Sequence, residues 1–204
     1  MPTEPATVPT TAPEKRQVLS SENQRRINIF LSNFAEQSIT SYPDDDYSML
    51  MFAYRFCKIN MSSKVHSGEN GYYINKKDMD TVLADYLGAT VYPESDYAVF
   101  EKAGHNTQII FEDDRYVFPY ADGAMCDYLA IVSSLVDNGD GTYLAEFNMY
   151  EVPYGVHKDH YKMSMDDITD DCGFEWLGYG YATVRDHVRS TGTQSYILLD
   201  YHVN

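Results

Sequence analysis

Residues 128–152 constrain the fold of this 204-residue chain more than any other stretch. Two apolar runs, LAIVSSLV and YLAEFNMY, flank the sequence DNGDG. Glycine and asparagine accept the positive φ angles that a tight reversal needs, so the stretch predicts a long antiparallel hairpin. The first arm is apolar on both faces, which indicates a strand covered on both sides, whereas the second arm alternates. We therefore expect this hairpin to be the central ribbon of a sheet.

Three helices are predicted before the hairpin, and two of them lie near the N-terminus. A capping-box pattern at Ser21 and Gln24 precedes apolar residues at helical spacing, which indicates a helix over residues 21–37. Three aspartates follow Pro43, where carboxylates favour the positive end of a helix dipole, and they indicate a helix over residues 44–58. Because this second helix is apolar on nearly every side, we expect it to be enclosed by other elements.

A third helix is predicted between Asn75, which forms a capping pattern with Asp78, and Gly88, which ends the apolar stripe. Its charged residues are expected to face solvent. They are Lys76, Lys77, Asp80 and Asp85. In the irregular stretch between residues 153 and 178, Ser164 is placed to cap one short helix.

Patterns of period two predict further strands. They cover residues 72–74, Tyr97–Phe100, 108–111, 116–118, 179–185 and 196–203. Helices followed by antiparallel strands predict an α+β fold in which three N-terminal helices pack on one face of a curved antiparallel sheet. This order of elements resembles the NTF2-like fold, and a cystatin-like arrangement or a new α+β sandwich would give the same order.

The first seventeen residues are rich in Thr and Pro and cannot bury a core, so we predict a disordered spacer over residues 1–17 and a single domain over residues 18–204. Such spacers often connect a membrane anchor to a folded extracytoplasmic domain. We expect that an export signal or lipid-anchoring segment preceded Pro2, and that the membrane is reached only through it. A disordered cytosolic terminus is the alternative.

The formal net charge of the chain is -16. Such a surface repels phosphate backbones and anionic lipid headgroups, so we predict no binding to nucleic acid or to a membrane surface. Solubility is the simplest explanation of the charge, and attraction of a basic partner is the alternative.

Three sequence phrases, INIFLSNFAEQ, YYINKKDMDTVLADYLG and DNGDGTYLAEFNMYEV, together with the Thr/Pro-rich start, resemble uncharacterised surface lipoproteins of Gram-positive bacteria. The resemblance covers most of the chain. It implies an extracytoplasmic location, secreted or lipid-anchored at the bacterial cell surface, and it implies no activity.

Sequence motifs for common catalytic and cofactor sites are missing. The chain has no GxSxG elbow, P-loop or GxGxxG, so no cofactor is predicted. The cysteines, Cys57, Cys126 and Cys172, have no CxxC spacing, and the sequence leaves open whether one pair forms a disulfide. The DNGDG loop fails as a calcium site, because glycines occupy the third and fifth positions where oxygen ligands are needed.

A weak metal motif lies in the sequence GVHKDHYK. His157, Asp159 and His160 supply two imidazoles and a carboxylate, which suit zinc. The spacing is not HExxH, and scattered surface residues explain the same letters. A metal-assisted hydrolase that uses His157 and His160 is therefore our second hypothesis for function.

Tyrosine is unusually frequent, with 19 residues against a single tryptophan. Most lie in the sheet half of the chain, where their rigid amphipathic side chains suit contact surfaces. We predict ligand contacts from Tyr143, Tyr150, Tyr179 and Tyr181. The leading hypothesis is a non-enzymatic extracytoplasmic domain that binds a small ligand, a glycan or a partner protein, and the third is a self-associating structural module.

Overall fold

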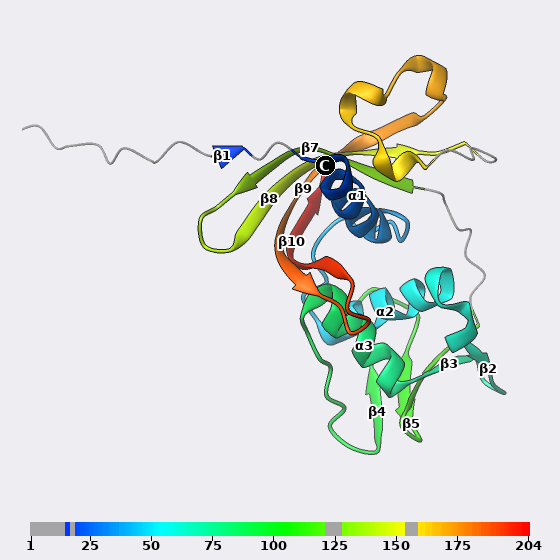
Figure 1. Ribbon diagram of the computed structural model, residues 1–204. Helices are drawn as coiled ribbons and strands as arrows, with labels where there is room; N and C mark the ends of the chain where they lie inside the picture. Colours follow the sequence, from blue (N-terminus) through cyan, green and yellow to red (C-terminus); the bar gives the residue numbers. More distant parts are fainter. Residues whose placement is uncertain (1–14, 17–18, 121–127, 154–158) are drawn as a thin grey trace, which may run out of the picture.

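The computed structural model describes residues 15–16, 19–120, 128–153 and 159–204 (Figure 1). The helices are α1 (Ser21–Ala35), α2 (Asp46–Asn60) and α3 (Lys76–Leu87). The strands are β1 (Lys15–Arg16), β2 (His66–Ser67), β3 (Tyr72–Asn75), β4 (Tyr97–Phe100), β5 (Ile109–Glu112), β6 (Arg115–Phe118), β7 (Tyr128–Asp137), β8 (Thr142–Glu151), β9 (Glu175–Val188) and β10 (Gln194–Val203). The predicted α+β class is confirmed.

The strands form two antiparallel sheets, whereas we expected one curved sheet. Sheet A has the order β1-β7-β8-β9-β10, and sheet B has the order β2-β3-β6-β5-β4. In Figure 1, sheet A and α1 form the upper part of the molecule, and α2, α3 and sheet B form the lower part. The NTF2-like arrangement, which requires a single curved sheet, is therefore not confirmed.

The predicted hairpin is confirmed as β7 and β8, which pair from Tyr128 opposite Glu151 to Asp137 opposite Tyr143. The turn uses Gly139 at φ 80° and Gly141 at φ 86°, a left-handed conformation that glycine adopts at low cost. The Asp137 carboxylate accepts a hydrogen bond of 2.8 Å from the Gly139 N–H. This aspartate therefore stabilises the turn through the backbone.

Helix α1 begins at Ser21 as predicted, but the predicted capping residue is wrong. Ser20 is the N-cap, and its hydroxyl accepts a hydrogen bond of 3.2 Å from the Asn23 N–H. Gln24 takes no part in the cap because its side chain is buried against sheet A. The capping-box pattern at Ser21 and Gln24 was thus a coincidence of spacing.

A buried polar stripe on α1 satisfies the edge of β7. The Gln24 side chain donates to the Val132 carbonyl at 2.8 Å, and the Asn28 side chain accepts from the Val132 N–H at 2.9 Å. The Ser32 hydroxyl accepts from the Ala130 N–H at 2.9 Å. Unpaired edge groups invite pairing with another chain, so these helical side chains protect the edge.

Helix α2 begins two residues later than predicted, at Asp46, because Asp45 is its N-cap and accepts a hydrogen bond of 2.8 Å from the Ser48 N–H. As expected, α2 is enclosed, and its residues join one hydrophobic core with α1, α3 and both sheets. Phe34 of α1 and Phe52 of α2 stack with ring centroids 4.7 Å apart in this core.

None of the described helices has the length and apolarity needed to cross a membrane.

Helix α3 ends at Gly88, as predicted, with φ at 60°. The expectation that Asp85 faces solvent is wrong, because this residue is only 8% exposed. Its carboxylate accepts hydrogen bonds of 2.8 Å from both the N–H and the hydroxyl of Ser190. Asp85 therefore ties α3 to the turn between β9 and β10, a contact that helical spacing cannot reveal.

Ordered backbone is found inside the stretch predicted to be spacer. Lys15 and Arg16 form β1 and pair with Asp137 and Val136 of β7. The other residues of the predicted spacer, 1–14 and 17, lie outside the described part of the chain. The edge of β7 is thus occupied by β1 at one end and by α1 at the other.

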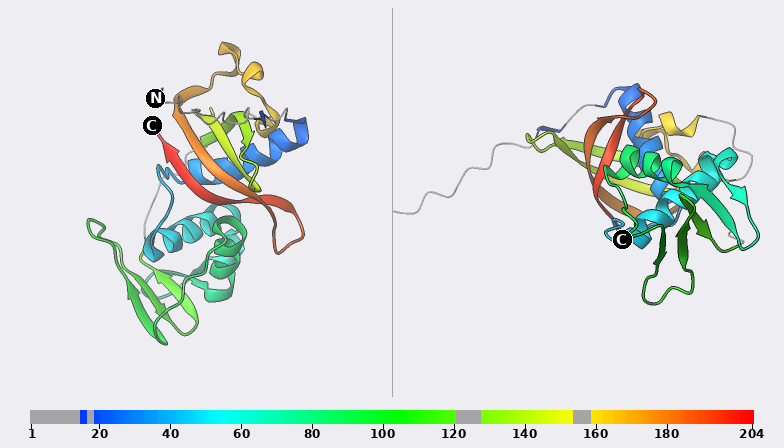
Figure 2. Two further views of the ribbon diagram at one scale, coloured as in Figure 1. Left: turned by 90° about the vertical axis from the view of Figure 1, so that its left-hand side faces the viewer. Right: turned by 90° about the horizontal axis from the view of Figure 1, so that it is seen from below.

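Residues 159–174, which we call the covering segment, pack on the face of β7 and β8 that is turned away from the core (Figure 2). Beneath it lie Leu129, Ile131, Tyr150 and Val152. The covering segment contributes Tyr161, Met163, Met165, Ile168 and Phe174. The prediction that β7 is covered on both faces is confirmed.

Within the covering segment, Ser164 caps the 3-10 helix Met165–Asp167, where we expected a short helix. The Ser164 N–H and hydroxyl both donate to the Asp167 carboxylate, at 2.7 Å and 2.8 Å.

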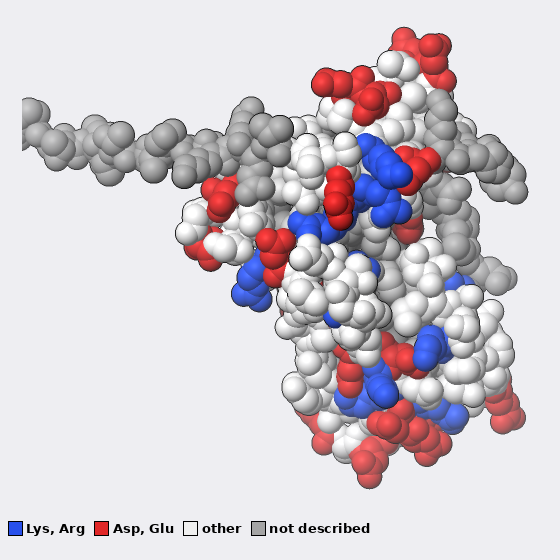
Figure 3. Space-filling model, viewed as in Figure 1, with Lys and Arg blue, Asp and Glu red and all other residues white. Residues whose placement is uncertain are grey.

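Figure 3 shows acidic side chains gathered over the covering segment and at the opposite end of the molecule, with basic side chains over α1 between them. The negative charge is therefore unevenly distributed.

Candidate binding surface

The four predicted ligand-binding tyrosines do not converge on one site. Tyr179 and Tyr181 lie on the face of sheet A that is turned away from the core, which we call the outer face, and they are 54% and 40% exposed. Tyr150 lies on the same face but is only 6% exposed, beneath the covering segment. Tyr143 pairs with the core residue Val184 and lies on the opposite face.

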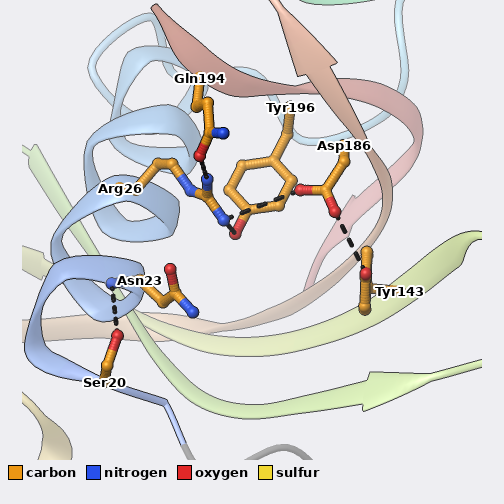
Figure 4. A network of polar contacts seen from close by, with 7 residues as sticks. All are labelled: Ser20, Asn23, Arg26, Tyr143, Asp186, Gln194 and Tyr196. Atoms are coloured by element: carbon orange, nitrogen blue, oxygen red, sulfur yellow. Dashed lines mark hydrogen bonds and ion pairs between the residues drawn. The ribbon is translucent and has the colours of Figure 1, made fainter.

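Tyr143 takes part in a polar network that joins α1 to three strands (Figure 4). Its hydroxyl donates to the Asp186 carboxylate at 3.1 Å, and burial together with that carboxylate raises the pKa of Tyr143. Arg26 of α1 lies 3.7 Å from Asp186 and donates to the Tyr196 hydroxyl at 3.0 Å and to Gln194 at 2.9 Å. This network braces the fold, so Tyr143 is occupied within the protein.

Trp176, the single tryptophan of the chain, belongs to the outer face and was missing from our predicted site. It lies opposite Tyr150, while Tyr179 lies opposite Asn148, so all of them point to the same side of the sheet. Trp176 is 55% exposed, a large fraction for so apolar a side chain. We call Trp176, Tyr179 and Tyr181 the aromatic strip.

The sequence carries a signal for this strip in the alternation LGYGYA, residues 177–182. Gly178 and Gly180 point toward the core side, and a Cβ at Gly180 would lie 2.5 Å from the Phe147 ring. The inward positions must be small because the core presses against this strand. The tyrosines consequently occupy the outward positions, which period two assigns to solvent.

Neighbouring polar side chains hold two rings of the aromatic strip in place. The Trp176 indole N–H donates to the Asn148 side-chain oxygen at 3.2 Å. The Tyr181 ring stacks on His202 with centroids 5.3 Å apart and planes inclined by 29°. Rings held in this way lose little conformational entropy when a ligand stacks on them.

The predicted metal-binding residues that the structure describes, Asp159 and His160, are engaged in other contacts. Asp159 lies 3.3 Å from Arg25 and 3.1 Å from Lys162, and the hydrogen bond from Lys162 lowers its pKa. The His160 ring packs against Tyr161, with centroids 4.7 Å apart. His157 lies outside the described residues. In the described ranges, no group of three His, Cys, Asp or Glu side chains is arranged to hold a metal.

The cysteines that the structure describes are Cys57 and Cys172, and both are free thiols. Burial raises the pKa of Cys57 to about 12, so it is an inert core residue at neutral pH. Cys126, the third member of the predicted set, falls in the part of the chain that is not described.

Clefts formed by residues that the structure describes include three that lie away from the aromatic strip. One of them, of about 680 Å³, is lined by the loop between β4 and β5 together with Ile110 and Val117 of sheet B. Clefts of about 500 Å³ and about 290 Å³ lie beside α3 and beside the start of α2. None of these three is lined by the aromatic strip, which is an open surface.

Comparison with known proteins gives no family for the chain: no family model matches it, and no curated protein or solved structure matches it either.

Proposed function

We propose that this chain is a non-enzymatic extracytoplasmic binding domain that holds a glycan chain against the aromatic strip. The observation that carries the proposal is the alignment of Trp176, Tyr179 and Tyr181 on one open sheet face, each at least 40% exposed. Sugar rings present apolar C–H faces that stack on flat aromatic rings, and removing both surfaces from water stabilises the contact.

Polar groups beside the strip suit the hydroxyl groups of sugars. Asn148 lies next to Tyr179, and Glu146 and His202 flank Tyr181 on the two neighbouring strands. Side-chain amides, carboxylates and imidazoles can both orient and bond hydroxyl groups. An aromatic strip with such a border suits an extended chain of sugar units.

The edges of sheet A argue against a peptide that adds as an extra strand, a mode that needs a free edge. The edge of β7 is occupied by β1 and by α1. At the other edge, the Tyr42 N–H donates to the Tyr201 carbonyl and the Val203 N–H donates to the Thr40 carbonyl, both at 3.0 Å. Strand addition is therefore blocked at these positions, and we propose that binding to sheet A uses its outer face.

The extracytoplasmic location is part of the same proposal, and the Thr/Pro-rich composition of residues 1–17 supports it.

The alternative function, a metal-assisted hydrolase, gains no support from Asp159, whose carboxylate is already paired with two cations. Elemental analysis of protein purified without chelators tests this alternative, and stoichiometric zinc would favour it.

The single tryptophan lies in the proposed site, so its fluorescence reports binding there directly. We expect titration with soluble hexasaccharides of glucose, mannose and N-acetylglucosamine to change the emission of Trp176 for at least one of them. Tyr179→Ala combined with Tyr181→Ala should weaken that binding by about tenfold or more. The matched control is Tyr92→Ala combined with Tyr97→Ala, which removes two exposed tyrosines that are distant in sequence from the aromatic strip.

Binding that both double variants weaken equally would place the glycan elsewhere, and no response to any hexasaccharide, whether neutral or built from glucosamine, would overturn the proposal. Light scattering on the same samples measures the oligomeric state and so tests the alternative that the chain is a self-associating module. A dimer that dissociates only in the Tyr179 and Tyr181 variant would show that the strip contacts a second copy of the chain.

A further inference from the structure

We infer that the aromatic strip selects glycans that carry amino groups, such as chains of glucosamine, over acidic glycans. This inference rests on the proposed function and names the ligand class for the same surface. It is motivated by the charged side chains that share the outer face with the three aromatic rings.

Glu146 provides the first part of the argument. It lies on β8 directly opposite Tyr181 of β9, so the two side chains project side by side from the sheet. Glu146 is exposed, and in the described part of the chain its carboxylate has no hydrogen bond or ion pair. A negative charge thus lies beside an exposed aromatic ring without a protein cation to neutralise it.

Asp200 adds a second negative charge on the same face. It lies on β10 opposite Thr183, which is the next outward position of β9 after Tyr181. Asp200 is exposed, and among the residues that the structure describes its carboxylate accepts only from the neighbouring Tyr201 N–H, at 2.9 Å. Two carboxylates therefore border the same end of the aromatic strip.

Basic side chains are missing from these positions. The residues paired with the strip are Glu146, Asn148 and Tyr150 from β8 and His202 from β10, and none of these described partners is Lys or Arg. Arg185 is the first such residue along β9, four positions beyond Tyr181. Because charges are screened over about 8 Å at physiological ionic strength, the local carboxylates determine selectivity more than the net charge does.

The strip offers an ammonium group two complementary attractions. Trp and Tyr ring faces attract cations, and an adjacent carboxylate adds a charge-assisted hydrogen bond. Glucosamine combines the stacking face of a sugar with such an ammonium group. An acidic sugar would place its carboxylate beside Glu146 and Asp200, where like charges repel.

The test uses the hexamer of glucosamine, whose amino groups can carry a positive charge, and the hexamer of N-acetylglucosamine, whose amino groups are acetylated and neutral. Both are titrated at about pH 6 with Trp176 fluorescence as the readout, and because the acetyl groups also differ, the effect of Glu146→Gln on the ratio isolates the charge. At low salt we expect the glucosamine hexamer to bind about tenfold more tightly. Glu146→Gln should reduce that ratio to about threefold, and the control Glu69→Gln, which changes an exposed acid between β2 and β3, should leave it unchanged. Added salt should reduce the ratio in the wild type.

The outcomes separate this inference from the proposed function. Equal binding of the two hexamers, or a ratio that Glu146→Gln does not lower, overturns the charge selectivity while leaving glycan binding in place. Absence of binding by either hexamer and by the neutral hexasaccharides overturns both. Tighter binding of an oligomer of galacturonic acid than of the glucosamine hexamer would also contradict the inference.

Discussion

The outer face of sheet A has two halves built from the same strands, and they differ in what lies on them. On one half, the covering segment buries Tyr150 together with Leu129, Ile131 and Val152. On the other, Trp176, Tyr179 and Tyr181 are exposed. Both halves carry large aromatic side chains, so composition alone does not distinguish them.

The difference shows how one sheet face can serve both stability and binding. The covered half repeats the arrangement of a core, in which apolar side chains from two segments exclude water. The bare half has outward aromatic rings that no described segment covers, and clustered exposed aromatic side chains are typical of contact surfaces. We therefore expect substitutions in the covered half to change folding and those in the bare half to change binding.

Tyr150→Ala should have the largest effect on stability. Removing this buried ring leaves a cavity under the covering segment, and we expect the free energy of unfolding to fall by about 3 to 4 kcal/mol. Tyr179→Ala should change it by less than about 0.5 kcal/mol because its ring is exposed. Urea denaturation measures both, and equal losses would show that the two halves do not differ energetically.

Asn28→Ala should have the second largest effect on stability, because Asn28 joins the covering segment to α1 and β7. Its side-chain N–H groups donate to the carbonyls of Tyr161 at 3.0 Å and Met163 at 2.9 Å, and its oxygen accepts from Val132. Truncation leaves these buried groups unpaired, at a cost of about 2 to 3 kcal/mol. Asn23→Ala, on the same helix, is the control, and a similar loss in both variants would contradict this role.

Alkaline pH should loosen the covered half through Tyr150. Burial raises its pKa, so the folded state keeps the phenol proton more tightly than the unfolded state does. This contribution to stability is fully present below the unfolded pKa of about 10 and is lost as pH rises through the raised folded value. Urea denaturation between about pH 9 and pH 12 should show a steeper fall for the wild type than for Tyr150→Phe. Parallel curves would mean that Tyr150 does not titrate differently on folding.

Asp159→Asn should have the smallest effect. The hydrogen bond from Lys162 lowers the pKa of Asp159, and the pair with Arg25 holds the covering segment to α1. The pair is partly exposed, so its loss should cost less than about 1 kcal/mol at neutral pH. The contribution is present above the unfolded pKa of about 4 and disappears as pH falls through the lowered folded value, so the two proteins should converge in acid. A difference that persists at low pH would contradict the ion-pair explanation.

Much of the secondary structure could be predicted because local patterns encode it. The hairpin, the three helices and the strand Tyr97–Phe100 follow from periodicity, from glycine at the turns and from capping residues. The errors are contacts with distant parts of the chain. Gln24 resembled a capping partner, but its side chain donates to the Val132 carbonyl. Helical periodicity placed Asp85 on the solvent-facing side of α3, but its carboxylate accepts from the Ser190 N–H.

The candidate site was predicted only in part. Tyr179 and Tyr181 lie on an exposed surface, whereas Tyr143 and Tyr150 are occupied within the protein. Trp176 was missed because it precedes the irregularity in pairing between β8 and β9, so simple alternation from Tyr179 does not place it on the outer face. The alternation of glycine and tyrosine from Gly178 onward was the available signal.

The sequence by itself determined the α+β class, the central hairpin and a first arm apolar enough to be covered on both faces, because these depend on residues near one another in the chain. The tertiary structure alone decided that the strands divide into two sheets and that the covering segment reaches Tyr150 but leaves Tyr179 bare. The physical reason is that burial depends on which distant segments meet, as Asn28 meets Met163, and no local periodicity records such a contact.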